Sequence, residues 1–430
     1  GDMVYANTVV EHGELLVEVT NKQQNLRLQQ IVQLIKSSEF HQSKQQKQLM
    51  EKADGLVKYN FIGMALTYLF TRSVSKALTF LLVDYSCALK LSSPATYLTA
   101  IKAASNQGIV IKGSNSLDEY AQVDTFVFDK TGTLTTGVPK IQRIIAYEGY
   151  DDEEVLRIAA CLEEHFYHPI ATAVVKKAED EGIEHEEMHG KLTHVASKGI
   201  VSSIDGKRVL IGSLELLEEE QTFISEQQKK VIEEYSQMFN LLYLSYDGKL
   251  IAIFLIDTPL RPEAIELLHE LKERGKQIVL LTGDTQKRTE TICSLISFDK
   301  VYTQVKPEQK HQVIQQLKDQ GHHVLMIGDG INDSAALSLA NVGVVMAGAS
   351  DIARQASDIL FLNEQLTGLH VLDTITDQLN HQLDLNLKNT VGINSFLMGL
   401  GLIDVLSPSV LALLHNVTTT FIIGKSLTYI

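Results

Sequence analysis

Several acidic residues of this sequence follow short apolar runs, a placement that suits phosphate chemistry. The first is Asp129, which begins the heptapeptide Asp-Lys-Thr-Gly-Thr-Leu-Thr directly after the strand-like run 125–128. A carboxylate at the end of a strand can attack the terminal phosphorus of ATP and form an acyl phosphate, provided that cations and amides neutralise the phosphoryl oxygens. We therefore predict Asp129 as a nucleophile. A solvated aspartate at a turn is the alternative for a lone Asp-Lys pair, and the full heptapeptide disfavours it.

Two further segments carry groups that can hold phosphoryl oxygens. Thr282, Gly283 and Asp284 follow the apolar run 278–281 and offer a hydroxyl group and backbone amides. Lys306 comes next along the chain, where a fixed cation can offset charge on the transferring phosphate. A Thr-Gly-Asp turn or a surface lysine is commonplace by itself, so the prediction depends on the order of these segments after the nucleophile.

The fourth segment clusters acidic and amide groups around small residues. Residues 328–333 read Gly-Asp-Gly-Ile-Asn-Asp and follow another apolar run. Hard oxygen ligands suit Mg²⁺, and a metal ion held by Asp329 and Asp129 would cancel the repulsion between nucleophile and nucleotide. We expect Asp333 to support this site by holding the metal ligands in place, and Asn332 is its neighbour in the segment. A Gly-Asp-Gly turn alone would be an ordinary loop.

Repeated units of strand, acidic turn and helix predict an α/β fold with a parallel sheet. Buried runs at 125–128, 278–281 and 324–327 are each followed by a turn that contains Gly or Asp and then by helical sequence. Ligands bind at the carboxyl ends of such strands, which is where each acidic segment falls. A long segment from about 138 to 255 interrupts the pattern and indicates an inserted α+β domain.

Charge and cysteine content exclude some classes of protein. The chain has 53 acidic and 38 basic residues and a formal net charge of -15, which argues against binding to nucleic acid. Its three cysteines are widely separated and odd in number, so a disulfide framework of the secreted kind is not expected. A reducing cytosolic setting fits this content.

Apolar stretches lie near both ends of the chain, at roughly 55–98 and 389–426, so the mean hydropathy of +0.01 averages two compositions. Their length predicts two hairpins of membrane-spanning helices, after a polar helical stalk. The alternative is a buried core hairpin, because Lys58, Asp84 and Lys90 interrupt the first stretch. The amino-terminus has no basic start and no apolar signal core.

The four segments, in this order and with a large insertion after the first, resemble the motifs of the P-type ATPases. In that family the phosphorylation domain has the haloacid-dehalogenase fold, and the resemblance covers essentially the whole chain. It predicts the following division: 1–30, a remnant of the actuator domain; 31–102, a stalk and two membrane helices; 103–138 and 257–375, the phosphorylation domain; 139–256, the nucleotide-binding domain; 376–430, two membrane helices.

The resemblance also implies roles for individual residues, with ATP and Mg²⁺ as cofactors. The catalytic and magnesium positions carry over as Asp129, Thr131, Thr282, Gly283, Asp284, Lys306, Asp329 and Asp333. Heavy-metal members of the family have a Ser-Glu-His-Pro sequence whose histidine lies against adenine, and His168 matches it although Phe-Tyr precedes it here. The family's upstream glutamate matches Glu163, and its Gly-x-Gly loop matches 197–199 with only Gly199 retained. Lys130 and Asn332 complete the predicted nucleotide contacts.

The transport site departs from the family, whose helix ahead of the phosphorylation domain carries Cys-Pro-Cys or a related pair. Here Ser86 stands in place of the proline, so we expect the kink that exposes carbonyl groups to be lost. A site of Cys87, Asp84 and His415 is our hypothesis. Because this set mixes a soft thiolate and a borderline imidazole with a carboxylate, Zn, Cd, Co, Mn, Fe and Cu all remain open as the transported ion.

The resemblance implies ATP-driven export of a transition-metal ion from the cytosol, by an integral protein of a bacterial cell membrane with its catalytic domains in the cytoplasm and lipid around its helices. The chain starts after the family's actuator loop, so we expect a fragment or a partner that supplies the rest. Two alternatives stay open: a truncated, non-transporting or regulatory member, and a soluble phosphatase of the same superfamily. Such phosphatases have an acid two residues after the nucleophile, where this chain has Thr131.

Overall fold

The computed structural model describes residues 44–147, 149–184, 189–196 and 198–430. Contacts between Cα atoms divide the chain into two compact units, which are described separately. Of the described residues, the helical unit contains those up to Asn106 together with Val110–Asp118 and Gln378–Ile430, and the catalytic unit contains those of Gln107–Ile109 and Glu119–Asp377. The predicted actuator remnant at 1–30 lies outside the described residues.

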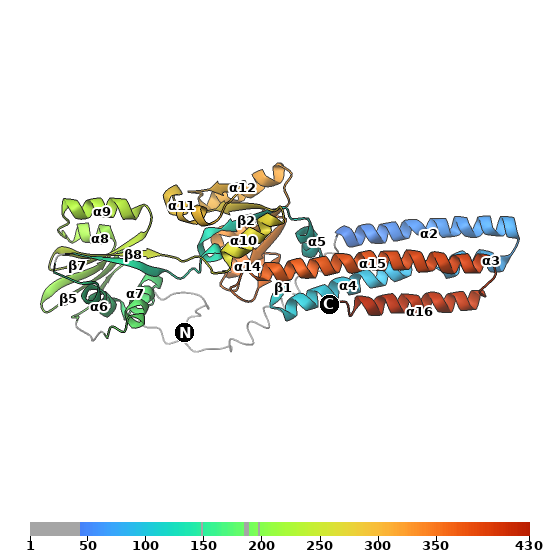
Figure 1. The fold of residues 1–430 in the computed structure, drawn as a ribbon, viewed down its shortest axis with the longest axis horizontal. Coiled ribbons are helices and arrows are strands. Elements are labelled where there is room, and N and C mark those ends of the chain that lie inside the picture. Colours follow the sequence, from blue (N-terminus) through green and yellow to red (C-terminus); the bar gives the residue numbers. More distant parts are fainter. Residues whose placement is uncertain (1–43, 148, 185–188, 197) are drawn as a thin grey trace, which may run out of the picture. The chain divides into compact units, whose positions relative to one another are not determined.

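A seven-stranded sheet forms the centre of the catalytic unit (Figure 1), and its strand order is β1-β13-β12-β11-β2-β9-β10. Every pairing from β13 to β10 is parallel, as the sequence predicts for its α/β fold. The bounds are β1 Ile109–Ile111, β2 Thr125–Asp129, β9 Gln277–Leu281, β10 Lys300–Tyr302, β11 Val324–Gly328, β12 Val342–Val345 and β13 Ile359–Phe361. All residues of β2 and β11 are buried, which explains their apolar composition.

Helices follow the strands of this sheet and bury one apolar side each against it. In α12, for example, Val313, Ile314 and Leu317 are buried and recur at helical spacing. The helices of this part are α10 Ala264–Glu273, α11 Gln286–Leu295, α12 Pro307–Asp319, α13 Ser334–Leu339 and α14 Asp351–Ala356, and the residues of α5 Ser114–Gln122 are divided between the two units. A short helical turn, η1 (Lys130–Leu134), comes directly after β2, and another, η2 (Ile331–Asp333), follows β11 after two intervening residues.

The inserted segment builds a second, antiparallel sheet with the strand order β3-β8-β7-β6-β5-β4. Its strands run from Lys140 in β3 to Asp257 at the end of β8, close to the predicted insertion at 139–256. The strand bounds are β3 Lys140–Ala146, β4 Thr193–Val195, β5 Gly199–Ile204, β6 Lys207–Gly212, β7 Asn240–Tyr246 and β8 Lys249–Asp257. The helices are α6 Asp152–Glu163, α7 Pro169–Asp180, α8 Leu214–Glu219 and α9 Glu226–Ser236.

Both faces of this antiparallel sheet carry apolar residues. Phe254, Ile211 and Leu244 belong to a core that includes residues of α6 and α7. Leu210, Tyr243 and Ile253 belong to another core that includes residues of α8 and α9. The domain therefore has helices on both faces, which accounts for the long apolar run in β8.

The helical unit contains α2 Lys44–Thr71, α3 Val74–Leu82, α4 Ser86–Asn106, α16 Pro408–Ser426 and most of α15 Gly368–Leu402. Val83, Leu397, Met398 and Leu411 form its apolar cluster. The expectation that Ser86 keeps this segment straight is wrong, because the chain is extended at Val83 and a new helix begins at Ser86. The carboxylate of Asp84 caps that helix, accepting from the backbone N–H of Ser86 at 2.9 Å and of Cys87 at 3.1 Å.

The four predicted membrane-spanning helices are a further point of difference. Within the described part of the chain, no helix is both long enough and apolar enough to cross a membrane. Two physical reasons are visible: α3 has only 9 residues, and charged residues such as Lys58 in α2 and Lys90 in α4 interrupt the apolar runs.

Candidate active site

Asp129 is the last residue of β2, the strand with β11 on one side and β9 on the other. Because these three strands are parallel, their carboxyl ends meet at one edge of the sheet. Asp129 lies opposite Leu281, the residue before Thr282, and β11 ends at Gly328, the residue before Asp329. The fold thus brings together the three segments that the sequence places after buried strands.

Three carboxylates converge at this edge. Asp129, Asp329 and Asp333 each offer an oxygen atom, and these atoms lie within 4.8 Å of one another. Asp129 is 6 % exposed and Asp333 is 1 % exposed. Like charges this close and this buried repel each other strongly, so the cluster requires cations.

Lys310 provides one of these cations. Its Nζ atom donates a hydrogen bond of 2.7 Å to Asp129 Oδ1 and one of 2.6 Å to Asp333 Oδ1. Lys310 is itself buried, at 7 % exposed, because it lies on the side of α12 that also carries Val313 and Ile314. An ammonium group in this position neutralises the carboxylate of Asp129, and such a group can also contact a phosphoryl group.

The sequence assigned this role to Lys306, and the structure places that residue elsewhere. Lys306 is the exposed N-cap residue of α12, and its backbone N–H donates to Gln309 Oε1. We therefore assign the cation position to Lys310, which sequence reasoning missed. The available signal was helical spacing, since Lys310 shares the register of Val313, Ile314 and Leu317 whereas Lys306 precedes the helix.

Burial and mutual repulsion shift the protonation of the acidic cluster. Burial, and then the charge of Asp333, raise the pKa of Asp129 to about 7, although Lys310 opposes the shift. Burial and Asp333 likewise raise the pKa of Asp329 to about 6. Burial opposes the charge on Lys310, but the attraction of Asp129 and Asp333 outweighs it and raises the pKa of that lysine. The cluster is therefore short of positive charge.

These residues fit a magnesium ion. The donor set is oxygen only, compact and anionic, which is what Mg²⁺ prefers, and a bound dication would relieve the repulsion that raises the acidic pKa values. Asp129, Asp329 and Asp333 would hold the ion. Thr131, the remaining residue predicted for this site, lies exposed in η1.

Close approach of Asp329 to η1 depends on Gly132. This glycine has φ +73°, and a Cβ atom built on it would lie 1.5 Å from Asp329 Oδ2. No side chain other than hydrogen fits this space, and few residues adopt this φ value. The glycine of the heptapeptide is therefore needed so that Asp329 can lie beside the nucleophile's loop.

The Thr-Gly-Asp segment also lies at this end of the sheet. Thr282 is 1 % exposed, and its Oγ1 atom accepts a hydrogen bond of 3.1 Å from the backbone N–H of Asp284. Asp284 forms an ion pair with Lys130, the residue after the nucleophile. Gly283 and Asn332 are exposed, so both can be reached from solvent.

The residues predicted to contact nucleotide lie in the inserted domain. Glu163 ends α6 and is 7 % exposed, and burial raises its pKa to about 7. His168 is the N-cap of α7 and is exposed, and its Nδ1 atom accepts from the backbone N–H of Ile170. Gly199 begins β5, and a Cβ atom on it would lie 2.2 Å from the carbonyl oxygen of Ile211.

A ring contact links the loop before His168 to the hairpin of Gly199. Phe166 stacks on His194 with ring centroids 5.5 Å apart. His194 lies on β4 opposite Ile200, the neighbour of Gly199. The sequence marked Phe166 only as part of the departure from the family's motif before His168, and it did not single out His194, whose signal was its nearness along the chain to the predicted residues.

The hypothetical transport ligands do not gather in the same way. Among the described residues, Asp84, Cys87 and His415 do not form a group with ligand atoms within 4.8 Å of one another. The Asp84 carboxylate caps α4, Cys87 is exposed, and His415 Nδ1 lies 3.3 Å from Asn394 Oδ1. Asn394 in turn donates to the carbonyl oxygen of Asp84 at 2.7 Å.

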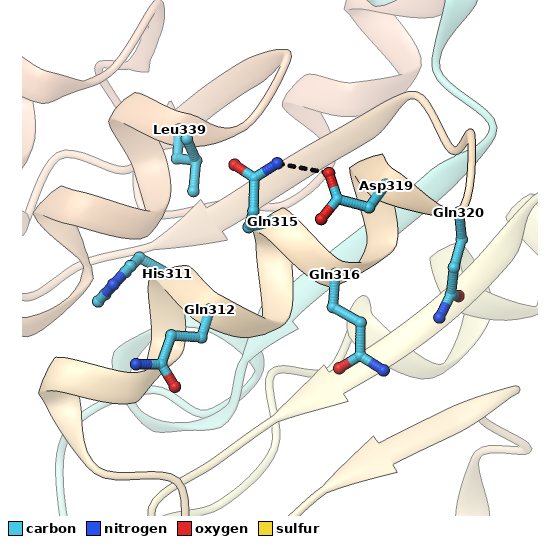
Figure 2. Close-up of a pocket in the computed structure, with 7 residues that line it drawn as sticks. All are labelled: His311, Gln312, Gln315, Gln316, Asp319, Gln320 and Leu339. Carbon is cyan, nitrogen blue, oxygen red and sulfur yellow. Dashed lines mark hydrogen bonds between the residues drawn. The ribbon is translucent and has the colours of Figure 1, made fainter.

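A cavity of about 640 Å³ lies along the outer side of α12 and carries none of these groups. Figure 2 shows its polar lining, in which Gln315 donates to Asp319 at 2.7 Å. The lining residues are His311, Gln312, Gln315, Gln316, Asp319, Gln320 and Leu339. Lys310, on the buried side of the helix, is not among them, so this cavity is separate from the acidic cluster.

Comparison with known proteins agrees with this geometry. The sequence model of the haloacid dehalogenase-like hydrolases matches residues 123–341. A zinc-exporting P-type ATPase of Mycobacterium marinum is 35% identical over 86% of this chain and 51% of its own length. A manganese-exporting P-type ATPase of Mycobacterium bovis is 33% identical over 86% of this chain and 52% of its own length. The chain thus spans about half the length of the curated relatives it matches.

Two solved structures are similar as well. A zinc-transporting PIB-type ATPase in its E2.Pi state has a TM-score of 0.76 at 23% identity, over 93% of this chain and 66% of that one, which is a likeness of fold. The catalytic domain of a CPx-ATPase, CopB-B, is 30% identical with a TM-score of 0.52, over 64% of this chain and 98% of that one. The chain belongs to the haloacid dehalogenase-like hydrolase family, as a homologue of the metal-exporting P-type ATPases.

Proposed function

We propose that this chain is the catalytic part of an ATP-driven exporter of transition-metal ions, in which Asp129 receives the γ-phosphoryl group of ATP. The observation that carries the proposal is the buried Asp129 at the end of β2, bonded to Lys310 at 2.7 Å and grouped with two further carboxylates. The names of the relatives, which export zinc or manganese, support a metal ion as cargo.

In this proposal each group has one task. Asp129 Oδ attacks the γ-phosphorus of ATP, a P–O bond forms, and ADP leaves with the electrons of the broken bond. Lys310 neutralises part of the charge that nucleophile and phosphoryl group share, and a Mg²⁺ ion held by Asp129, Asp329 and Asp333 would supply further positive charge there. Thr282 and the backbone amides after it can hold the phosphoryl oxygens. Glu163, His168 and Gly199 mark the expected nucleotide contacts, with Phe166 and His194 beside them.

Thr131 favours phosphoenzyme formation over simple phosphate-ester hydrolysis. A phosphatase of this superfamily would need an acid there, two residues after the nucleophile, to protonate a leaving group. A hydroxyl group cannot serve as that acid, so an acyl phosphate formed on Asp129 would persist long enough to drive a further step. We place the catalytic unit on the cytosolic side of the membrane, where ATP is available.

The experiment is phosphate incorporation from γ-labelled ATP in membranes that contain the chain. We expect acid-stable label that hydroxylamine releases, and at least about a 100-fold loss in Asp129→Asn, because an amide cannot form the acyl phosphate. Asp180→Asn, on an exposed position of α7, is the matched control and should label normally. Undiminished label in Asp129→Asn would refute the proposal.

A panel of Zn²⁺, Cd²⁺, Co²⁺, Mn²⁺, Fe²⁺ and Cu⁺ added to the same assay tests the cargo. Stimulation of labelling by one ion would identify it as the substrate. Labelling that is indifferent to every ion would contradict coupling to metal transport and leave only the phosphoryl chemistry. The Cys87→Ala variant should lose the stimulation if Cys87 is a ligand, while its basal labelling stays unchanged.

A further inference from the structure

Arg261 lies on the segment that leads from the inserted domain back to the parallel sheet, and no motif singled it out. This segment runs beside the loop after Asp129: the backbone N–H of Arg261 donates to the carbonyl oxygen of Leu134 at 2.8 Å. The guanidinium group reaches back along the same loop. Its Nε donates to the carbonyl oxygen of Thr133 at 2.8 Å and its Nη2 to that of Gly132 at 3.0 Å.

The remaining guanidinium nitrogen is held from the other side. Nη1 of Arg261 donates to the carbonyl oxygen of Glu364, and Glu263 Oε1 accepts from the backbone N–H of Leu366. The planar fork of Arg261 therefore joins η1 to the segment that follows β13, and its orientation is fixed at all three nitrogens. Arg261 is 7 % exposed, so little water competes with these bonds.

The partners of Arg261 are unusual for a buried charge. Arg274 pairs with the carboxylate of Asp373, but no carboxylate among the described residues lies within ion-pair distance of Arg261. Burying a cation without an anion is costly unless hydrogen bonds satisfy it, and here only carbonyl dipoles do so. The positive charge of Arg261 is therefore not cancelled by a paired carboxylate, and it lies beside η1, the loop that follows Asp129.

The carbonyl groups that Arg261 holds belong to the residues that set the shape of the site. Gly132 is the position where a Cβ atom would meet Asp329, so a small shift of this loop changes the distance from Asp329 to the nucleophile. The backbone N–H of Gly132 in η1 donates to Thr135 Oγ1 at 3.2 Å, and the fork of Arg261 adds an external restraint on the two successive carbonyl groups of Gly132 and Thr133.

We propose that Arg261 is a positioning residue for phosphoryl transfer, which fixes η1 and with it the separation of Asp129 and Asp329. The inference rests on the proposed function, because it concerns the rate at which Asp129 is phosphorylated. Arg261 acts through the backbone of this loop, because its side-chain hydrogen bonds within the described part of the chain go to the carbonyl oxygens of Gly132, Thr133 and Glu364.

The test compares the rate of phosphoenzyme formation at saturating γ-labelled ATP in Arg261→Ala, Arg261→Lys and a control, Arg274→Ala. We expect Arg261→Ala to label about 100-fold more slowly, the loss typical of a catalytic group displaced by about 1 Å. Arg261→Lys should lie between it and the wild type, because an ammonium keeps the charge but cannot bind both carbonyls in a plane. The KM for ATP should change by less than about twofold, and added guanidinium should restore part of the rate in Arg261→Ala.

Labelling of Arg261→Ala at the wild-type rate would overturn the inference, and so would a raised KM for ATP with an unchanged rate. If Arg261→Ala does not fold, Arg261→Lys decides: slower labelling at a wild-type melting temperature supports the role, and wild-type labelling removes it. Absence of label in the wild-type chain would refute the proposed function itself, which separates the two failures.

Discussion

At the scale of single residues, Lys306 and Lys310 differ by one helical turn and by their surroundings. Lys306 is exposed at the start of α12, while Lys310 is buried and bonded to two carboxylates. Burial strengthens an electrostatic interaction because little water screens it. A lysine therefore interacts strongly with the acidic cluster at position 310 and is a solvent-exposed residue at position 306.

We predict that Lys310→Met lowers the rate of phosphoenzyme formation by about 100-fold or more, because the nucleophile loses its buried cation. Lys306→Met, the matched control, should stay within about twofold of the wild type. Both rates are measured with γ-labelled ATP by rapid quench. A loss in Lys306→Met alone would return the cation role to Lys306. Equal losses in the two variants would contradict the assignment to Lys310 alone.

At the scale of elements, the carboxyl ends of β9, β2 and β11 and the turns after them build the site. The sheet brings Asp129 beside Leu281, and the turns η1 and η2 carry the chain away from the strands within a few residues. Such tight turns leave no room for side chains where two of them meet. The glycine at position 132 is the clearest case.

We predict that Gly132→Ala abolishes phosphorylation and destabilises the catalytic unit by on the order of 2 kcal/mol or more, because its methyl group would overlap Asp329. Gly248→Ala is the matched control, since Gly248 has φ +75° but nothing within 4 Å of a Cβ atom. It should lose only about 1 kcal/mol from backbone strain and label normally. Denaturant titration and labelling check both values, and equal destabilisation would argue against the close approach.

A second element-scale feature is the break between α3 and α4. The sequence pointed to the missing proline as the loss of a kink, but α3 ends at Leu82 with Val83 extended, and Asp84 caps the start of α4. A side-chain cap and a proline are different chemical means of interrupting a helix. Because Asp84 is used in this way, its oxygens already have partners, and a ligand role would compete with the cap.

At the scale of the whole molecule, buried acids affect stability as a function of pH. Glu163 has a pKa raised to about 7 from 4.5 by burial, so the folded chain binds its proton more tightly than the unfolded chain does. Between these values the unfolded state holds fewer protons, and the free energy of unfolding falls as pH rises. The contribution is fully present below about pH 4.5 and is lost as pH passes about 7.

We predict that the wild-type chain in EDTA loses on the order of a few kcal/mol of stability between about pH 5 and pH 8, and that Glu163→Gln removes part of this slope. The glutamine should raise the melting temperature at pH 8, since it is neutral at every pH. Glu179→Gln, on an exposed position of α7, is the control and should leave the slope unchanged. A slope identical in all three chains would show that Glu163 is ionised in the fold.

Bound Mg²⁺ should also affect the stability of the whole molecule, because it should counter the loss of stability with rising pH at the acidic cluster. Asp129 and Asp329 also have raised pKa values, and a dication binds their deprotonated forms. Its stabilising effect therefore grows with pH across the range in which these groups lose protons.

The sequence by itself determined the α/β class, the inserted domain and the three aspartates of the acidic cluster. These follow from short-range signals: buried runs that end in Asp or Gly can be read residue by residue, and parallel strands bring their ends together by topology. The antiparallel sheet from Lys140 to Asp257 lies where the pattern of strand, turn and helix was interrupted.

Only the tertiary structure decided which cations serve that cluster and where the helices of the other unit break. Lys310 depends on the rotation of α12 against the sheet, and Arg261 reaches carbonyl groups more than 120 residues earlier in the chain. The cap by Asp84 replaces a proline that the sequence alone suggested was needed. Long side chains such as Lys and Arg are mostly found at surfaces. Helical spacing indicates the buried side of α12 for Lys310, but the sequence around Arg261 gives no sign that folding has buried it.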